Sequence, residues 1–262
     1  RRFGDLEFLG GLVLTSRARA FGGLSGLRTL DGGRELLAIG DKGSWFRARL
    51  VTDTPGRPRT IEDAVVAPLL DDHARPFRRD WDRDAESLTL RRDGPALLAH
   101  VGFEHHHRIL AYRSTSGAKG LLAAPGHPIA VPADVGRLPP NRGLEALADR
   151  PDGSLFAAAE DPAPGGEAHP AWLLGEGAAK RFRIAAADGF SITDAAVLPS
   201  GDLLVLERRL SMFGRFAMRI GRVAAADLAA DRLVTPRLLL EADGGDEIDN
   251  MEALAVDTAA DG

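Results

Sequence analysis

The chain has 262 residues, 44% of them hydrophobic and 27% charged, which is the composition of a globular protein with its own core and excludes a disordered or fibrous chain. It contains no cysteine, and this excludes thiol nucleophiles, zinc–thiolate sites, iron–sulfur clusters and disulfide bonds. The formal net charge of −5, the lack of a long basic stretch and the lack of a long apolar run predict neither a nucleic-acid partner nor a membrane span.

A hairpin pattern recurs along the chain: a short alternating strand, an Asp-Gly or Ser-Gly turn, and a second apolar strand. The copies begin at residues 25, 86, 145, 194 and 252, which gives steps of 61, 59, 49 and 58 residues. The second strands are expected at residues 35–39, 95–101, 154–159 and 202–206, and further strands at 108–112, 171–174, 216–223 and 237–240. No long helical periodicity is present.

Repeats of this length with about four strands each are typical of β-propeller blades. The fifth copy stops at the Asp261-Gly262 turn, with no second strand after it. We therefore expect an all-β propeller of about six blades, with residues 1–262 as a single domain whose last blade or blades are incomplete at the C-terminal end.

Acidic residues recur in phase with the hairpins. They start the first strand of a copy at Glu86, Glu145, Asp194 and Glu252, and end the second strand at Asp41, Glu104, Glu160 and Glu207. The loops at one end of a propeller channel converge, so these acids are expected on one rim. Clustered carboxylates repel one another unless cations offset them, and calcium suits such oxygen ligands best. The alternative is that each acid caps a turn or accepts backbone hydrogen bonds.

Basic residues lie close to these acids in the sequence. Arg142, Arg208 and Lys42 could clamp a phosphate on the same rim, although ordinary ion pairing would also explain them. His105 and His107 would point the same way on an extended segment and could bind a metal or donate a proton. The run also fits an exposed turn between two strands, and no third metal ligand is identifiable by spacing.

Six segments together resemble one bacterial family. They are FGGLSGL at 21–27, GDKG at 40–43, NRGLEAL at 141–147, SITD at 191–194, LVLERR at 204–209 and DNMEAL at 249–254. The chain is similar to the family called esterase-like activity of phytase, or phytase-like domain, from about Phe8 to its last residue. Ala146 and Ala253 depart from the family by standing where its repeat often has glycine.

The resemblance implies a β-propeller with repeated acids, export to the periplasm or the outside, and phosphoester hydrolysis. We therefore expect an exported, monomeric, calcium-assisted hydrolase of a small anionic phosphoester. The expected catalytic residues are Glu86, Glu145 and Asp194; the metal ligands are Asp41, Glu86, Glu104, Glu145, Glu160, Asp194, Glu207 and Glu252; and the substrate-binding residues are Arg142, Arg208, Lys42 and His105. Two alternatives stay open: a non-catalytic propeller that binds a ligand or protein, and a metal-dependent lactonase or carboxylesterase.

Overall fold

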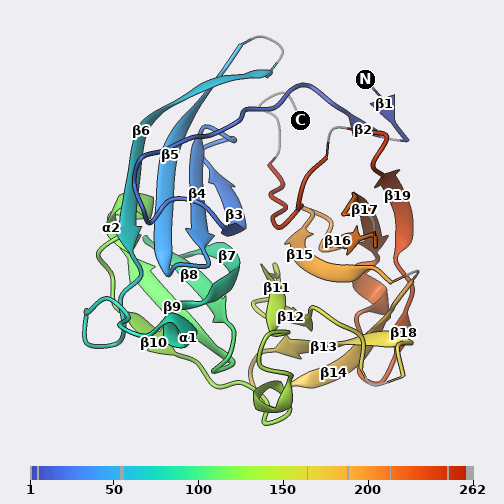
Figure 1. The fold of residues 1–262 in the computed structure, drawn as a ribbon. Coiled ribbons are helices and arrows are strands. Elements are labelled where there is room, and N and C mark those ends of the chain that lie inside the picture. The colour runs from blue at the N-terminus through green and yellow to red at the C-terminus, as the bar shows by residue number, and fades with distance from the viewer. Residues whose placement is uncertain are drawn as a thin grey trace.

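A computed structural model describes residues 2–4, 6–53, 56–163, 165–187, 189–212, 214–246 and 248–257. Four β-sheets stand around a common axis, each with its first strand innermost (Figure 1). The prediction of an all-β propeller is confirmed. The predicted count of about six blades is not met, because the described residues form four blades.

The four blades follow one another along the chain. The first consists of β3 (Leu24–Leu30), β4 (Glu35–Gly40), β5 (Ser44–Thr52) and β6 (Pro58–Pro68), and the second of β7 (Ala85–Asp93), β8 (Ala96–Phe103), β9 (Arg108–Ser114) and β10 (Gly126–Pro128). The third consists of β11 (Leu144–Asp149), β12 (Leu155–Ala159), β13 (Ala168–Leu174) and β14 (Lys180–Ala185), with β18 (Leu233–Val234) parallel to β14. The fourth consists of β15 (Ser191–Val197), β16 (Leu203–Leu210), β17 (Phe216–Val223) and β19 (Arg237–Ala242).

Few other elements accompany the blades. β1 (Arg2–Phe3) and β2 (Leu6–Glu7) form a small hairpin beside β19, and the chain then runs across to the first blade (Figure 1). Two short α-helices, α1 (Asp80–Arg83) and α2 (Gly117–Leu121), and two 3-10 turns at Val135–Arg137 and Ala225–Asp227 lie in connections. None of these helices is long and apolar enough to cross a membrane.

The predicted strands of the inner hairpins are confirmed, and the strands that were not predicted lie farther out in the blades. β6 is an edge strand whose side chains are mostly exposed, with Pro58 at its start and Pro68 at its end. Edge strands tolerate proline and charged residues, so they lack the apolar alternation that identifies an inner strand. β5 and β14 were missed for a related reason, since arginines interrupt the apolar pattern of both.

The predicted strand in the fifth copy of the repeat is not found. Residues 251–257 form no strand, and the Asp261-Gly262 turn lies outside the described residues. The segment lies against β15, where the Thr193 hydroxyl donates to the Met251 carbonyl and the Leu254 N–H donates to Asp194 at 2.8 Å each. Side-chain and backbone contacts of this kind hold it in place without a ladder of strand hydrogen bonds.

The buried guanidinium of Arg28 joins the blades at the axis. It donates to both carboxylate oxygens of Asp194, at 2.8 and 2.9 Å. It also donates to the carbonyls of Leu147 in β11, Ala195 in β15 and Leu254, at 2.8 to 2.9 Å. A single side chain of the first blade thus contacts the third blade, the fourth blade and the C-terminal segment.

Replacement of Arg28 should therefore destabilise the whole ring. Arg28→Met leaves the fully buried Asp194 without its cation and three carbonyls without a donor, and we expect it to lower the free energy of unfolding by about 3–5 kcal/mol. Urea denaturation measures this loss. Arg113→Met is the control, because Arg113 pairs with Asp93 on the surface and should matter little. A loss for Arg28→Met no larger than that of the control would contradict the assignment.

His169 in β13 is a buried histidine that remains uncharged. It is fully buried, and neither ring nitrogen reaches hydrogen-bond geometry with a described residue. Burial lowers the pKa of His169 from 6.5 to about 4. Between pH 6.5 and about pH 4, the unfolded chain therefore binds a proton at this histidine that the folded chain does not bind.

Acid should accordingly weaken the fold through His169. Because the pKa of His169 is lower in the folded chain, its contribution to stability is complete above pH 6.5 and should fall by about 3 kcal/mol as the pH drops to 4. The measurement is the free energy of unfolding of the wild type and of His169→Leu between pH 7 and 4. The difference between the two proteins should change in favour of the variant, whereas parallel pH profiles would show that His169 is not the titrating group.

Candidate functional site

A β-bulge interrupts the innermost hairpin of every blade at the same place. The bulged residues are Ser25, Glu86, Glu145 and Thr193 in the first to fourth blades. A bulge leaves one residue out of the ladder and re-aims its side chain. Ser25, Glu86 and Glu145 all line one pocket at the axis.

A second residue of the same pocket lies opposite each bulge, directly after the partner strand in the first three blades and within β16 in the fourth. In the first three blades this residue is an acid, namely Asp41, Glu104 or Glu160. Their backbone N–H groups donate to the carbonyls of residues 23, 84 and 143, each two positions before the bulge, at 2.9 to 3.1 Å. Gly23 has a φ of +56°, and a Cβ there would collide with the Asp41 carboxylate, so only glycine fits beside this acid.

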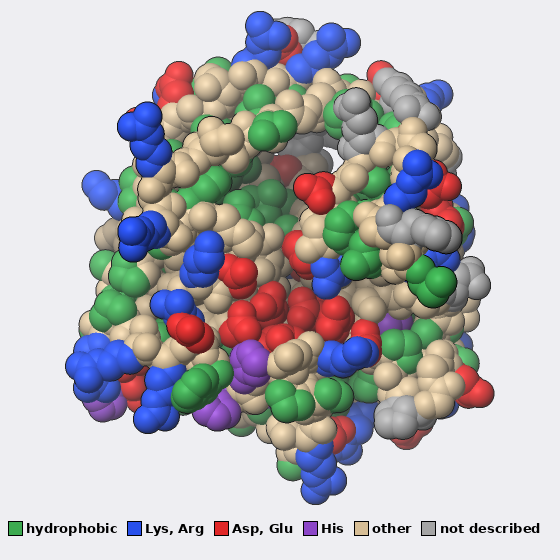
Figure 2. Space-filling view, in the orientation of Figure 1, with side chains coloured by type: hydrophobic (Ala, Val, Ile, Leu, Met, Phe, Trp, Pro, Cys, Tyr) green, Lys and Arg blue, Asp and Glu red, His purple; other side chains and the backbone are tan. Residues whose placement is uncertain are grey.

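The axial pocket has a volume of about 450 Å³ and a strongly acidic lining. Six of its residues, named here the acidic cluster, are carboxylic acids: Asp41, Glu86, Glu104, Glu145, Glu160 and Glu252. The remaining lining residues are Gly23, Leu24, Ser25, Asn141, Arg208 and Asn250. Figure 2 shows the carboxylates gathered in the hollow at the centre of this face, with histidine and basic side chains at its border.

The structure does not bring Asp194 and Glu207 into the acidic cluster, and the bulge explains why. In the fourth blade the residue equivalent to Glu145 is Thr193, and the residue equivalent to Glu160 is Arg208. Asp194 and Glu207 are each displaced by one position from these places. Since side chains alternate between the two sides of a strand, a shift of one residue turns both acids away from the pocket.

Both displaced acids have arginine partners of their own. Asp194 is held by Arg28, as described above, and Glu207 accepts hydrogen bonds from Arg219 at 2.7 and 2.9 Å. Both acids are fully buried. Their surroundings are those of structural ion pairs in the interior.

Glu160 and Glu252 share Arg208, whereas the other four members of the acidic cluster have no arginine partner among the described residues, and their electrostatics reflect it. Burial raises the pKa of Glu145 well above 4.5, and repulsion from Glu86, Glu160 and Glu104 raises it further. Burial likewise raises the pKa of Glu86, with Asp84 adding to the effect. The pKa values of Asp41, Glu104 and Glu252 are also raised, in each case chiefly by burial. The pocket therefore favours the binding of a cation or of a positively charged group of a ligand.

Three members of the cluster are close enough to share one cation. Oxygen atoms of Glu104, Glu145 and Glu160 all lie within 4.8 Å of one another. Two oxygens bound to one calcium ion at 2.3–2.6 Å can be at most about 5 Å apart, so this trio fits the coordination sphere. Excess carboxylate charge and hard oxygen donors likewise fit calcium better than a softer metal.

Arg208 is the one basic residue among the described residues that line the pocket. Its guanidinium donates to Glu252 at 2.6 Å, to Glu160 at 3.2 Å and to the side-chain oxygen of Asn250. The side chain is 25% exposed, so it is held by carboxylates while still facing the pocket. This position allows it to meet an anionic ligand.

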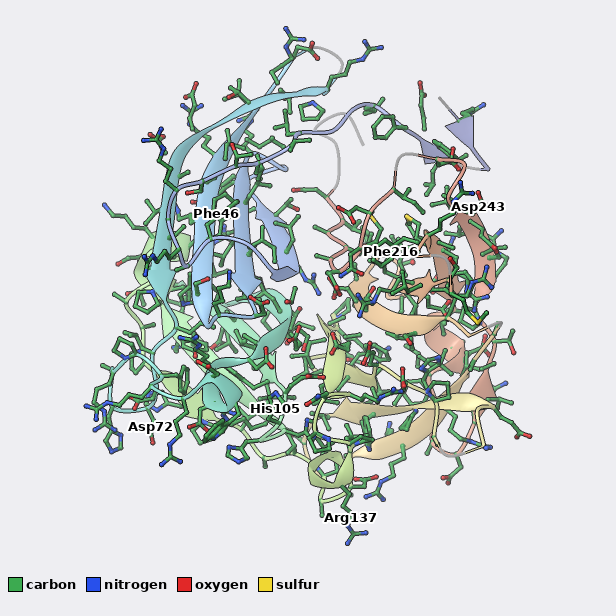
Figure 3. All side chains as sticks on the ribbon, in the orientation of Figure 1. Phe46, Asp72, His105, Arg137, Phe216 and Asp243 are labelled. Atoms are coloured by element: carbon green, nitrogen blue, oxygen red, sulfur yellow. The ribbon has the colours of Figure 1, made fainter. Side chains whose placement is uncertain are left out.

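The other predicted substrate-binding residues lie outside the axial pocket. Arg142 is exposed and pairs with Asp161. Lys42 and His105 line a neighbouring cavity, and His105 contacts Asp84 at 3.1 Å. Figure 3 places His105 near the axis, beside the lower part of the second blade. The histidine run forms the turn between β8 and β9, as one of its two interpretations predicted.

Sequence reasoning missed several residues of the site. Ser25, Asn141 and Asn250 line the axial pocket, and Asp84 lies with Glu104 and His105 in a second group whose ligand atoms are all within 4.8 Å of one another. The signal for Ser25 was present, because it occupies the first copy of the position that holds Glu86 and Glu145. A comparison restricted to acids does not detect this position, because its first copy carries a serine.

Solved structures that match this chain include a β-propeller domain and a set of WD40 repeats, both at low sequence identity. The β-propeller domain of Cps50 (Swd1) from Myceliophteria thermophila is 17% identical with a TM-score of 0.37, over 74% of this chain and 50% of that one. The RRP9 WD40 repeats are 10% identical with a TM-score of 0.39, over 80% and 53%. This chain thus spans about half the length of both.

A third similar structure is the PQQ-bound aldose sugar dehydrogenase from Streptomyces coelicolor, at 14% identity and a TM-score of 0.46, over 95% of this chain and 89% of that one. No protein of curated function matches the sequence. A family model does match: Phytase-like, described as esterase-like activity of phytase, over residues 19–262. The chain therefore belongs to the Phytase-like family, as its sequence motifs predicted.

Proposed function

We propose that this protein is a metal-assisted phosphoester hydrolase, with calcium as the assisting ion and the axial pocket as its active site. The observation that carries the proposal is the excess of carboxylates in that pocket, where the six acids of the acidic cluster face one lining guanidinium. Membership of the Phytase-like family supports a hydrolase of this kind. Export to the periplasm or the outside remains a prediction from the family resemblance.

Glu104, Glu145 and Glu160 would hold the ion, since their oxygens already lie within the span of one coordination sphere. When bound there, a calcium ion would supply positive charge to phosphoryl oxygens and lower the pKa of an attacking water molecule. Asp41 and Glu252 lie around this trio and add to the negative potential that attracts the ion. Asp194 and Glu207 have no part in the proposed chemistry, because each is enclosed with its own arginine.

Two further side chains are assigned to the phosphoester itself. The Arg208 guanidinium donates N–H hydrogen bonds to phosphoryl oxygens in place of part of its present contacts with Glu160 and Glu252. Glu86 lies outside the trio, and burial favours its protonated form, so its carboxyl group holds the proton that passes to the leaving oxygen. The Ser25 side chain interacts with Glu86 and opposes part of the rise in its pKa.

The first test is metal dependence of binding and turnover. The purified protein should bind calcium in a calorimetric titration and release phosphate from phytate or 4-nitrophenyl phosphate, with activity lost on chelation and restored by calcium. Glu145→Gln removes a central ligand and should weaken calcium binding by about 100-fold, in line with the cost of disturbing a metal site. Glu62→Gln is the matched control, because Glu62 lies on the exposed edge strand β6.

Several outcomes of this test are decisive. Absence of phosphate release under any metal condition would refute the proposal. Lactone or carboxylester turnover in its place would identify a metal-dependent lactonase or carboxylesterase on the same pocket. Calcium binding without any turnover would indicate a ligand-binding propeller.

The second test concerns Arg208. Arg208→Gln should raise the KM for a phosphoester by about tenfold or more, because a charge-assisted hydrogen bond to the phosphoryl group is lost. Arg208→Lys should recover only part of this, since a lysine cannot reproduce the planar fork. Arg222→Gln is the control, because Arg222 pairs with Asp202 away from the pocket. A KM for Arg208→Gln equal to that of the control would exclude Arg208 from substrate binding.

A further inference from the structure

A second cavity lies directly beside the axial pocket. It has a volume of about 650 Å³, and Asp41 lines both spaces. The two are also joined through Asp84 and His105 of the cavity wall, whose ligand atoms lie within 4.8 Å of an oxygen of Glu104 in the axial pocket. Its volume is in the range of small-molecule sites. A ligand with one group at the acidic cluster could therefore extend into this cavity.

The wall of the cavity carries an exposed aromatic ring. Trp81 in α1 is 49% exposed, whereas Trp45 and Trp172, the other two tryptophans, are 0% and 2% exposed. The ionic groups around it are largely satisfied by one another, since Arg83 pairs with Asp80 at 2.7 Å and His105 with Asp84 at 3.1 Å. The Arg79 guanidinium lies 5.8 Å from the centre of the indole ring, and the remaining surface of the ring is the large apolar area that this wall presents to a ligand.

The short helix that carries Trp81 is fixed from two sides. At Gly43, in the turn between β4 and β5, an added Cβ would lie 2.6 Å from the Cβ of Arg83, so the helix rests directly on that turn. From the second blade, His106 contacts Asp82 at 2.8 Å and Arg108 donates to the Asp82 carbonyl. The Arg108 guanidinium lies 4.3 Å from the ring centre of Phe103. Such anchoring holds the helix that carries Trp81 in place before a ligand arrives.

We infer that this cavity receives the aromatic group of a phosphoester whose phosphoryl group lies at the acidic cluster. The inference rests on the proposed function for the phosphoryl end, and it names the substrate class: esters of a planar aromatic alcohol, or of a nucleoside. Stacking of a ring on an exposed, pre-positioned indole provides binding without a demand for particular hydrogen bonds. Aryl and nucleoside esters share this chemistry and are separated by the test.

The experiment compares three substrates on the calcium-loaded protein: phenyl phosphate, adenosine monophosphate and glycerol phosphate. Trp81→Ala should raise the KM for an aromatic substrate by about tenfold, and by at least fivefold more than for glycerol phosphate. Trp81→Phe should restore most of the aromatic preference. Comparison of each variant with the wild type on the same substrate cancels differences in leaving-group chemistry. Leu210→Ala is the control for removal of an exposed apolar side chain, since Leu210 is 61% exposed on the fourth blade.

A binding measurement keeps the inference separate from the proposed function. Because Trp81 is the exposed tryptophan, acrylamide should quench chiefly its fluorescence, and phenyl phosphate or adenosine monophosphate should protect it where glycerol phosphate does not. Protection without hydrolysis would support the aromatic site and refute the hydrolase. Hydrolysis with equal KM changes for all three substrates in Trp81→Ala, and no selective protection, would overturn the aromatic site and leave the hydrolase standing. Protection by only one aromatic ligand would identify which ester the site accepts.

Discussion

The buried ion pair between Arg28 and Asp194 is the constraint on which this ring depends. Its partners come from the first, third and fourth blades and from the C-terminal segment, so one guanidinium satisfies polar groups that no strand ladder could reach. A charge buried this deeply is costly when it stands alone, and each member of the pair is tolerable only because of the other. Arg28 thus links the first blade to the fourth, the two blades at opposite ends of the series along the chain.

Buried acids outside the acidic cluster have arginine partners, as this pair illustrates. The chain has 30 arginines and only three lysines among its 33 basic residues, and it places arginine beside the buried acids that hold the fold together. Asp194 has Arg28, and Glu207 has Arg219. Glu145 is 5% exposed, and its strongest neighbours are other carboxylates. Under the proposed function, the positive charge that Glu145 lacks within the chain is the bound cation.

The sequence predicted the architecture and most of the pocket, because hairpins and their acids repeat with the blades. The prediction failed where it depended on single-residue register. Aligning Asp194 with Glu145 matched residue types, whereas aligning Ile192 with Leu144 would have matched the buried position before each bulge and placed Thr193 opposite Glu145. The outer strands escaped prediction because they face solvent, and Trp81 escaped because a four-residue helix has no periodicity to detect. Glu252 lines the pocket on a segment without strand structure. The repeat predicted Glu252 as a site residue, but the contacts that hold it in the pocket are not those of a repeated strand.

The axial pocket is asymmetric because the fourth blade departs from exact repetition. If the fourth blade repeated the pattern of the second and third, an acid would stand at Arg208, and carboxylates would surround the pocket on all sides. The fourth blade has the guanidinium of Arg208 at this position. The donor that would bind phosphoryl oxygens therefore comes from a different blade than the carboxylates that would hold a cation. The turn between β4 and β5 and the connection before β7 contribute a further difference, because Asp41 and Asp84 there border the cavity with the exposed indole. Under the proposed function, an ester would be oriented with its phosphoryl group between the trio of glutamates and Arg208, and its organic group beyond Asp41. A perfectly symmetric ring of acids could concentrate cations, but it could not distinguish the two ends of a substrate.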